Sequence, residues 1–250
     1  QNLDLYKINV IDRNKRINNK NITFFEGDIF NVKFLKKSIL ESNPDIIYYL
    51  LSNFSINSNQ KYKKYINNSS NILSEIFQIL NNKIRFIYLG SSAQFGEPEN
   101  NLELINESKK FNPLSYYGKL KVFEELKIRE LSEKFIVDVI YTRIFNLIGP
   151  NEPIRMVGGS FVKQLLDSRL KLKVGNLFPK RDFLDVRDAS NALKIIALKG
   201  ELNSIYHICS GKSISIKFFL DLIIKELGCN PNIEVDNNRL NKNEINNIVG

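Results

Sequence analysis

Short apolar runs rich in β-branched and aromatic residues alternate along this chain with longer stretches whose apolar positions recur at helical spacing. Strands are predicted at residues 6–11, 22–25, 45–51, 84–89 and 135–141. Helices are predicted between them, at residues 32–41, 61–80 and 115–133. Residues 45–51 are almost continuously apolar, as in a strand that is buried on both faces of a parallel sheet. The first 150 residues therefore predict an α/β fold with a doubly wound parallel sheet.

Beyond Pro150 the alternation of short and long apolar segments becomes looser. Helices are predicted at residues 161–167, 189–198 and 215–227, and strands at residues 172–175 and 204–208. We expect residues 151–250 to form a smaller C-terminal lobe that packs beside the sheet and is interleaved with it.

The composition excludes several classes of protein. With 43% hydrophobic and 25% charged residues among 250, the chain is too apolar to be disordered. No run approaches the roughly 18 apolar residues of a membrane helix, so we expect no membrane partner. Two cysteines, Cys209 and Cys229, build no disulfide framework, and no Cys/His cluster predicts a metal site. His207 is the only histidine, so a Ser-His-Asp triad would have to use it.

The net charge of +9 raises the question of a nucleic-acid partner. The lysines are scattered, and the densest group holds only Lys61, Lys63 and Lys64. A basic patch or stripe is what a polyanion needs, and the richness in asparagine, isoleucine and lysine explains the charge as compositional bias. We therefore expect no nucleic-acid partner, and small anionic ligands fit the charge equally well.

Polar or small residues follow five of the predicted strands, at the edge where an open parallel sheet binds its ligands. They are Asp12 with Arg13, Gly27 with Asp28, Ser52, Gly90 with Ser91 and Ser92, and Arg143 followed by Asn146. Asp12 stands where a dinucleotide-binding sheet places its ribose-binding carboxylate, but the glycine-rich turn should lie roughly 20 residues earlier. Either there is no dinucleotide site, or that turn belongs to sequence before Gln1; a solvated turn residue is an equal interpretation of Asp12.

The stronger combination is Ser91 with Tyr117 and Lys121. Tyr117 and Lys121 are four residues apart and hence share one face of a helix. An ammonium beside a phenol favours the phenolate, which suits a general acid or base. A hydroxyl at a strand end, such as that of Ser91, can hold a carbonyl or alcohol against the phenol. The Tyr–Lys spacing alone is weak, because it is common on exposed helices.

Several ordered motifs give this pattern a context. They are SSAQFG at 91–96, NPLSYYGKLK at 112–121 and RIFNLIGP at 143–150, followed by VGNL at 174–177, RDFLDVRD at 181–188 and YHICSG at 206–211. The first three resemble the motifs of the extended short-chain dehydrogenase/reductases, the NAD-dependent epimerases and dehydratases of nucleotide sugars. The last three are similar to the GDP-6-deoxy-4-keto-mannose reductase branch. The resemblance extends from about residue 6 to residue 250.

The resemblance implies a Rossmann-like domain over residues 1–150 and a substrate-binding lobe over residues 151–250. Tyr117 would be the proton donor or acceptor, Lys121 its partner and a ribose ligand, and Ser91 the hydroxyl that orients the sugar oxygen. The cofactor, NAD or NADP, would be held by Tyr117 and Lys121 and by Asp12, Asp28, Leu50 and Ser52. Two leucines, Leu50 and Leu51, are unusual in the turn that passes the cofactor. Asp12 favours NAD, and Arg13 allows NADP.

The same resemblance implies a nucleotide-sugar site made of Ser91, Ser92, Asn146, Arg181 and Arg239. Arginine suits this role because its planar fork pairs two phosphate oxygens. Where relatives place a further phosphate-binding arginine, this chain has Asn241.

Other matched positions are given structural interpretations. Asn67 matches a structural asparagine of the fold, Asp188 is expected to cap a helix, His207 to be packed in a strand, and Arg143 to be an ion-pair partner.

One departure from the family pattern bears on the reaction. Dehydratases of the family carry a carboxylate two residues after the catalytic hydroxyl, and this chain has Ala93 there, which disfavours dehydration.

We expect a cytoplasmic, homodimeric, NAD(P)-dependent reductase of a nucleotide-linked 4-keto-6-deoxy sugar. The alternatives are a nucleotide-sugar C4 epimerase and a non-catalytic relative that keeps only a binding fold. We also expect the chain to be truncated at both ends, without its first strand and glycine-rich turn and with an incomplete lobe, and to be poorly stable alone.

Overall fold

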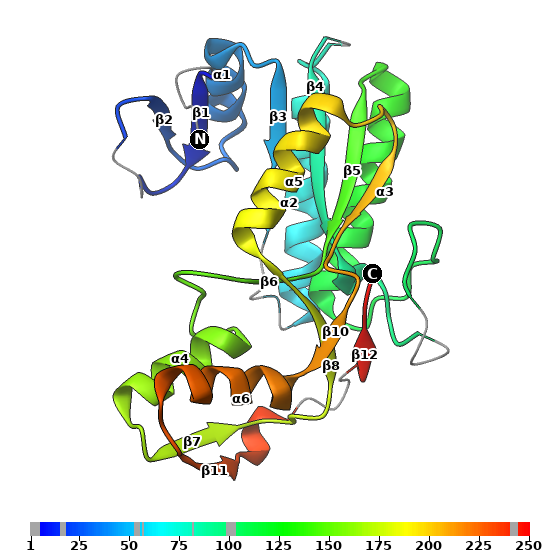
Figure 1. Ribbon diagram of the computed structural model, residues 1–250. Helices are drawn as coiled ribbons and strands as arrows, with labels where there is room; N and C mark the ends of the chain where they lie inside the picture. Colours follow the sequence, from blue (N-terminus) through cyan, green and yellow to red (C-terminus); the bar gives the residue numbers. More distant parts are fainter. Residues whose placement is uncertain are drawn as a thin grey trace.

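The computed structural model describes residues 6–15, 19–52, 56, 58–81, 83–98, 104–240 and 245–250. Within them a parallel four-stranded sheet has the order β3–β4–β5–β9. Its strands are β3 (Ile46–Tyr49), β4 (Arg85–Ser91), β5 (Val139–Ile144) and β9 (Ile205–Ile208). A second parallel pair, β1 (Ile8–Asp12) and β2 (Ile22–Glu26), lies beside it with α1 (Val32–Ser42) (Figure 1).

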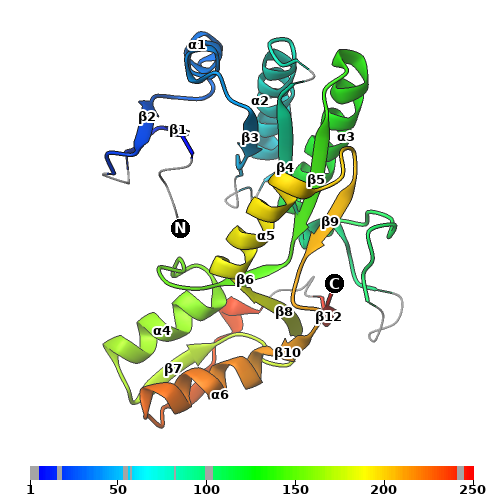
Figure 2. The same ribbon diagram turned by 45° about the horizontal axis from the view of Figure 1, so that its top comes forward.

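Helices cover both faces of the main sheet. On one face lie α2 (Asn59–Phe77) and α3 (Tyr116–Phe135), and on the other lies α5 (Val186–Lys199) (Figure 2). Ser58 caps α2 and Ser115 caps α3, each through a side-chain oxygen that accepts a backbone N–H of the first turn. The two caps determine where the helices begin, and hence which residues of α3 face the ends of the strands.

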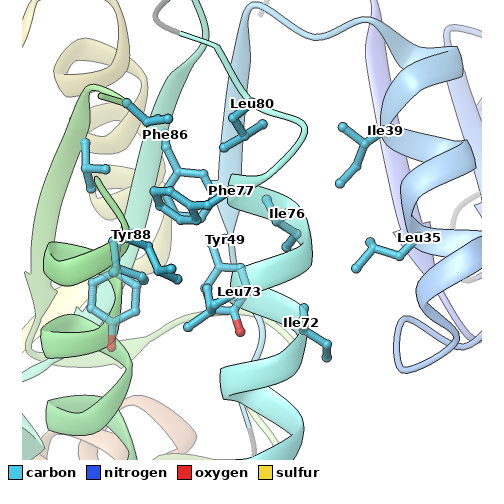
Figure 3. Packing of buried hydrophobic residues seen from close by; sticks show 14 of the residues in the cluster. Leu35, Ile39, Tyr49, Ile72, Leu73, Ile76, Phe77, Leu80, Phe86 and Tyr88 are labelled. Carbon is cyan, nitrogen blue, oxygen red and sulfur yellow. The ribbon is translucent and has the colours of Figure 1, made fainter. Parts of the chain in front are cut away.

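The largest apolar core lies between the sheet and the helices α1, α2 and α3 (Figure 3). Aromatic rings from the strands fill it: Tyr49 and Tyr88 stack with centroids 6.3 Å apart, and Phe77 of α2 packs on Phe86 at 5.1 Å. Phe77, Phe86 and Tyr88 are completely buried. Aromatic pairs at these spacings add to the burial energy of the rings, so the face of the sheet beneath α2 and α3 is rigidly packed.

The C-terminal lobe is built from short strands and two helices, below the main sheet in Figure 1. It contains β6 (Asn146–Ile148), β8 (Lys180–Asp185), β10 (Ser213–Ser215) and β12 (Asn247–Ile248), which gather around β8. It also contains the parallel pair β7 (Lys171–Val174) and β11 (Asn232–Val235), with α4 (Val157–Asp167) and α6 (Ile216–Leu227). A separate apolar cluster holds α4, α6 and β7 together.

The chain returns from the lobe to the main sheet, since α5 packs on the sheet and β9 pairs with β5. The α/β parallel fold expected from the sequence is confirmed, and each expected helix and strand is present with shifted ends. The pattern did not predict β6, β8, β10, β11 or β12.

The capping prediction for Asp188 is wrong: Asp185 is the N-cap of α5 and accepts from the backbone N–H of Arg187 at 2.8 Å. Across the residues described above, no helix is long and apolar enough to span a membrane.

Candidate active site

Ser91 and Tyr117 lie on two elements that are packed directly against each other. Ser91 is the last residue of β4 and begins the short 3-10 helix η2 (Ser92–Gln94), whereas Tyr117 lies in the first turn of α3. Gly118 makes the contact possible, because a Cβ atom there would lie 2.0 Å from the carbonyl oxygen of Ala93. The glycine of the motif therefore brings the first turn of α3 against the turn that carries Ser91.

A chain of buried hydrogen bonds fixes the orientation of this turn. The backbone N–H of Ser91 donates to Oε1 of Gln94 at 2.9 Å, and Nε2 of Gln94 donates to Oε2 of Glu125 at 2.7 Å. Arg143 donates to both oxygens of Glu125, from Nη2 at 2.8 Å and from Nε at 3.2 Å. The expectation that Arg143 is an ion-pair partner is confirmed, and its partner lies on the helix that carries Tyr117.

Lys121 lies one helical turn beyond Tyr117 and is only 2% exposed. Its Nζ donates to the carbonyl oxygen of Leu51 at 3.1 Å and to Oε2 of Glu124 at 3.0 Å, and lies 5.3 Å from the ring centre of Tyr88. The ammonium is thus held at the end of β3, beneath the turn expected to pass the cofactor. Leu50 in that turn is 64% exposed and Ser52 is exposed, so both are available to a ligand.

Asp12 and Asp28 lie at the ends of β1 and β2 and are linked through Arg13. The backbone N–H of Arg13 donates to Oδ1 of Asp12 at 2.6 Å, and its Nη2 donates to Oδ1 of Asp28 at 3.0 Å. A hydrogen bond from the backbone N–H of Phe30, followed by the Arg13 contact, outweighs burial and lowers the pKa of Asp28. The guanidinium that would allow NADP is therefore already paired with the aspartate expected to hold adenine.

The residues expected to bind the nucleotide sugar lie in three places, the first being Ser91 and Ser92 at the end of β4. Asn146 and Arg181 lie on the paired strands β6 and β8: Nδ2 of Asn146 donates to the carbonyl of Asp182 at 3.3 Å, and Nη1 of Arg181 donates to the carbonyl of Ile245 at 2.7 Å. Arg239 instead contacts the start of α4, donating to Oγ of Ser160 at 3.2 Å.

Two further residues are singled out by the sequence, Ser92 and Asn241. Ser92 lies in η2 and is buried. Asn241, expected where relatives place an arginine, lies outside the described residues.

Two structural interpretations have different outcomes. His207 is packed as expected, with Nδ1 3.0 Å from the carbonyl oxygen of Ile105 and its ring against Phe95 and Phe145; burial lowers its pKa. Asn67 is exposed on α2, and its structural role stays a prediction. The buried polar residue of that helix segment is Ser69, which donates to Oε1 of Glu124 at 3.2 Å.

Sequence reasoning missed three buried polar residues of the site: Gln94, Glu124 and Glu125. The available signal was spacing, since Glu124 and Glu125 follow Lys121 by three and four residues and must share its helix face. Burial by itself raises the pKa of the Glu125 carboxyl, but the hydrogen bonds and charge of Arg143, with hydrogen bonds from Arg129 and Gln94, outweigh it and lower that pKa.

Solved structures and curated proteins resemble the chain over most of its length. Its fold superposes on a crystal structure of dTDP-glucose 4,6-dehydratase from Bacillus anthracis in complex with NAD, with a TM-score of 0.82 and 20% identity, over 98% of this chain and 79% of that one. A dTDP-D-glucose 4,6-dehydratase from Dictyostelium discoideum is 26% identical over 209 residues, covering 78% of this chain and 48% of the relative. A GDP-6-deoxy-D-mannose reductase from Pseudomonas aeruginosa is 28% identical over 145 residues, covering 55% and 47%.

The chain therefore has the α/β parallel-sheet fold of this NAD-bound structure. The family model described as GDP-mannose 4,6 dehydratase matches residues 1–249, and the chain belongs to this family. The chain spans about half of the length of either curated relative.

Proposed function

We propose that the protein is an NAD(P)-dependent reductase of a nucleotide-linked 4-keto-6-deoxy sugar. One observation carries the proposal: Gly118 approaches the carbonyl of Ala93, so the turn of α3 that includes Tyr117 packs on the turn that follows Ser91, and Lys121 is held on the carbonyl of Leu51. These are the groups that a carbonyl reduction needs, namely a proton donor, a hydroxyl that orients the carbonyl, and a cation that stabilises the phenolate left behind.

Each residue has a defined task in this reaction. The bound nicotinamide supplies the hydride. Ser91 donates a hydrogen bond to the keto oxygen and holds it towards Tyr117, whose phenol gives its proton to the developing alkoxide. Lys121 stabilises the resulting phenolate by its positive charge. The packing of the first turn of α3 on the turn after β4 supports this arrangement, because reacting groups that are held in place before substrate arrives lower the barrier.

The residues around the turn argue against dehydration. Elimination of water needs an additional acid or base near Ser91, and the position two residues further on is the methyl side chain of Ala93. The neighbouring carboxylate of Glu125 is tied to Arg143 and Arg129, both at 2.8 Å, and so is committed to structure. A reaction that needs only one proton donor suits this site better than one that needs two.

The cofactor is proposed to lie across the ends of the strands. The hydroxyls of its adenosine ribose would donate to the carboxylate of Asp12, and its adenine would lie near Asp28. The ribose next to the nicotinamide would approach the ammonium of Lys121, and the turn with Leu50 and Ser52 would pass its phosphates. The donor and acceptor chemistry of these residues fits NAD or NADP. We propose that Ser92, Asn146, Arg181 and Arg239 contact the nucleotide sugar, and that the enzyme is a homodimer.

The test is incubation of the purified protein with candidate 4-keto-6-deoxy nucleotide sugars and NADH or NADPH. The proposal predicts net oxidation of the cofactor with formation of the 6-deoxy sugar. The same residues would also serve a C4 epimerase, which isomerises its substrate without net consumption of cofactor. Failure of both reactions and of cofactor binding would leave a non-catalytic relative and overturn the proposal.

A further inference from the structure

Glu124 lies three residues beyond Lys121 on α3, on the same buried face of the helix. The two side chains are 1% and 2% exposed, and Oε2 of Glu124 is 3.0 Å from Nζ of Lys121. The other carboxylate oxygen accepts from Oγ of Ser69 on α2 at 3.2 Å, and the hydroxyl of Tyr88 on β4 lies 3.5 Å from Oε2. Side chains from α2, β4 and α3 thus contact this carboxylate, and the one from α3 is Lys121.

A buried ammonium is costly unless an opposite charge compensates it. Lys121 finds that compensation in Glu124, whereas the adjacent carboxylate of Glu125 points to Arg143 and Arg129. The two buried carboxylates therefore have different partners: Glu124 pairs with Lys121, and Glu125 pairs with Arg143 of the sheet.

The buried tyrosines beside the pair carry no charge that could substitute for Glu124, and the charge of Glu125 is paired with Arg143 and Arg129. Tyr49 on β3 and Tyr88 on β4 are fully buried, and burial, followed by the charge of Glu124, raises the pKa of each well above its ordinary value. They stay neutral through the working range of pH. On α3 itself the remaining neighbours are Tyr117 and Glu125, and α2 contributes only the uncharged Ser69.

We propose that Glu124 is a positioning residue for Lys121: its carboxylate compensates the buried ammonium and keeps it seated on the carbonyl of Leu51, one helical turn from Tyr117. The inference deepens the proposed function, on which the role of Tyr117 rests. In such a reaction the alkaline limb of the pH profile reports the loss of a proton that activity needs. Removing a nearby negative charge makes such a proton leave at lower pH.

The kinetic test compares the alkaline limb of the kcat–pH profile for reduction of a keto sugar. In Glu124→Gln the limb moves to lower pH by about one to two units. In Glu124→Asp, which keeps the charge at a longer distance, it moves less. The matched control is Glu130→Gln: Glu130 pairs with Lys127 at the same spacing on the same helix, at 2.8 Å, but is 63% exposed. A limb that stays in place in Glu124→Gln, or moves equally in Glu130→Gln, overturns the proposal.

A second measurement does not require turnover, so it separates this inference from the proposed function. The free energy of unfolding is measured from neutral to alkaline pH for the wild type, Glu124→Gln and Glu130→Gln. A lysine that has lost its partner has a folded-state pKa below its unfolded value, and its stability cost fades as pH rises and the proton leaves. The deficit of Glu124→Gln is expected to shrink with rising pH and to be largely abolished by adding Lys121→Met. A deficit that is the same at every pH, or that persists in the double variant, contradicts the role of Glu124 even in a protein that reduces no sugar.

Discussion

The carboxylate of Glu125 on α3 accepts two hydrogen bonds from the guanidinium of Arg143 on β5, at 2.8 and 3.2 Å. Both side chains are essentially buried. Gln94 extends the contact to the turn that bears Ser91, through its 2.7 Å hydrogen bond to the same carboxylate. A single ion pair thus joins the strand, the helix and the turn that together form the candidate active site.

Replacement of Arg143 by methionine removes one partner of this pair and leaves the Glu125 carboxylate buried. We expect the free energy of unfolding to fall by about 3–5 kcal/mol, as is typical when a buried ion pair is broken. Urea denaturation measures the effect. The control is Lys163→Met, which breaks an exposed pair with Asp167 at 2.6 Å and should cost less than about 1 kcal/mol. Equal losses in the two variants would contradict the structural role given to Arg143.

The same pair predicts an acid-sensitive stability. The folded-state pKa of Glu125 is below its ordinary value, because the bonds from Arg143 and Arg129 outweigh burial. Its contribution is therefore complete above the unfolded value of about 4.3 and is lost as pH falls through the lower folded value. Unfolding curves at several acidic pH values should show a shallower dependence on pH for Glu125→Gln than for the wild type. Parallel curves for the two proteins would refute this.

The parallel sheet and its helices could be predicted from the sequence because they follow simple periodicity. The strand around residues 45–51 is apolar throughout, and α6 has apolar residues at helical spacing. By contrast, β8 has the sequence KRDFLD, whose charged residues are typical of a segment exposed to solvent. It forms because Asp182 is completely buried and accepts from the backbone of Ser210 and Gly211, partners distant in the chain. Local patterns carry no information on such contacts.

The site was predictable to a similar degree. Ser91, Tyr117 and Lys121 could be singled out because a strand end and a four-residue helical spacing mark them. Glu124 and Glu125 could not, because two adjacent glutamates on a helix usually face solvent. Here α3 is covered both by the sheet and by α2, and that second covering depends on tertiary packing. The binding roles of Asp12, Asp28, Asn146, Arg181 and Arg239 stay predictions.

Gly118→Ala tests the close approach between α3 and the turn after β4. In a helix, alanine is normally the more stable residue by about 1 kcal/mol, but here its Cβ would collide with the carbonyl of Ala93. We expect a stability loss of about 1–3 kcal/mol and a fall in kcat of about 10²-fold, because Tyr117 is displaced. Differential scanning calorimetry and steady-state kinetics measure the two effects.

The control for this change is Lys119→Ala, an exposed neighbour on the same turn. It should leave both quantities near wild type. If Gly118→Ala behaves like Lys119→Ala, the two elements are not held together as described.

Arg13→Ala tests the choice of cofactor. Arg13 directly follows the expected ribose carboxylate, Asp12, and it pairs with Asp28 at 3.0 Å. If it also contacts the 2′-phosphate of NADP, its loss should lower kcat/KM for NADPH relative to NADH by about 10-fold or more, the worth of a charge-assisted hydrogen bond. Lys15→Ala, which removes a nearby exposed charge, should leave the ratio unchanged. An unaltered ratio in Arg13→Ala would assign that residue to structure alone.

The most direct measurement is the turnover of Tyr117→Phe with a 4-keto-6-deoxy nucleotide sugar and the preferred cofactor. The variant lacks one oxygen atom and keeps the ring, so the fold and ligand binding should be preserved. The account predicts a fall in kcat of about 10²–10⁴-fold with little change in the dissociation constant of the cofactor. A kcat near that of the wild type would show that the proton comes from elsewhere and would contradict the account.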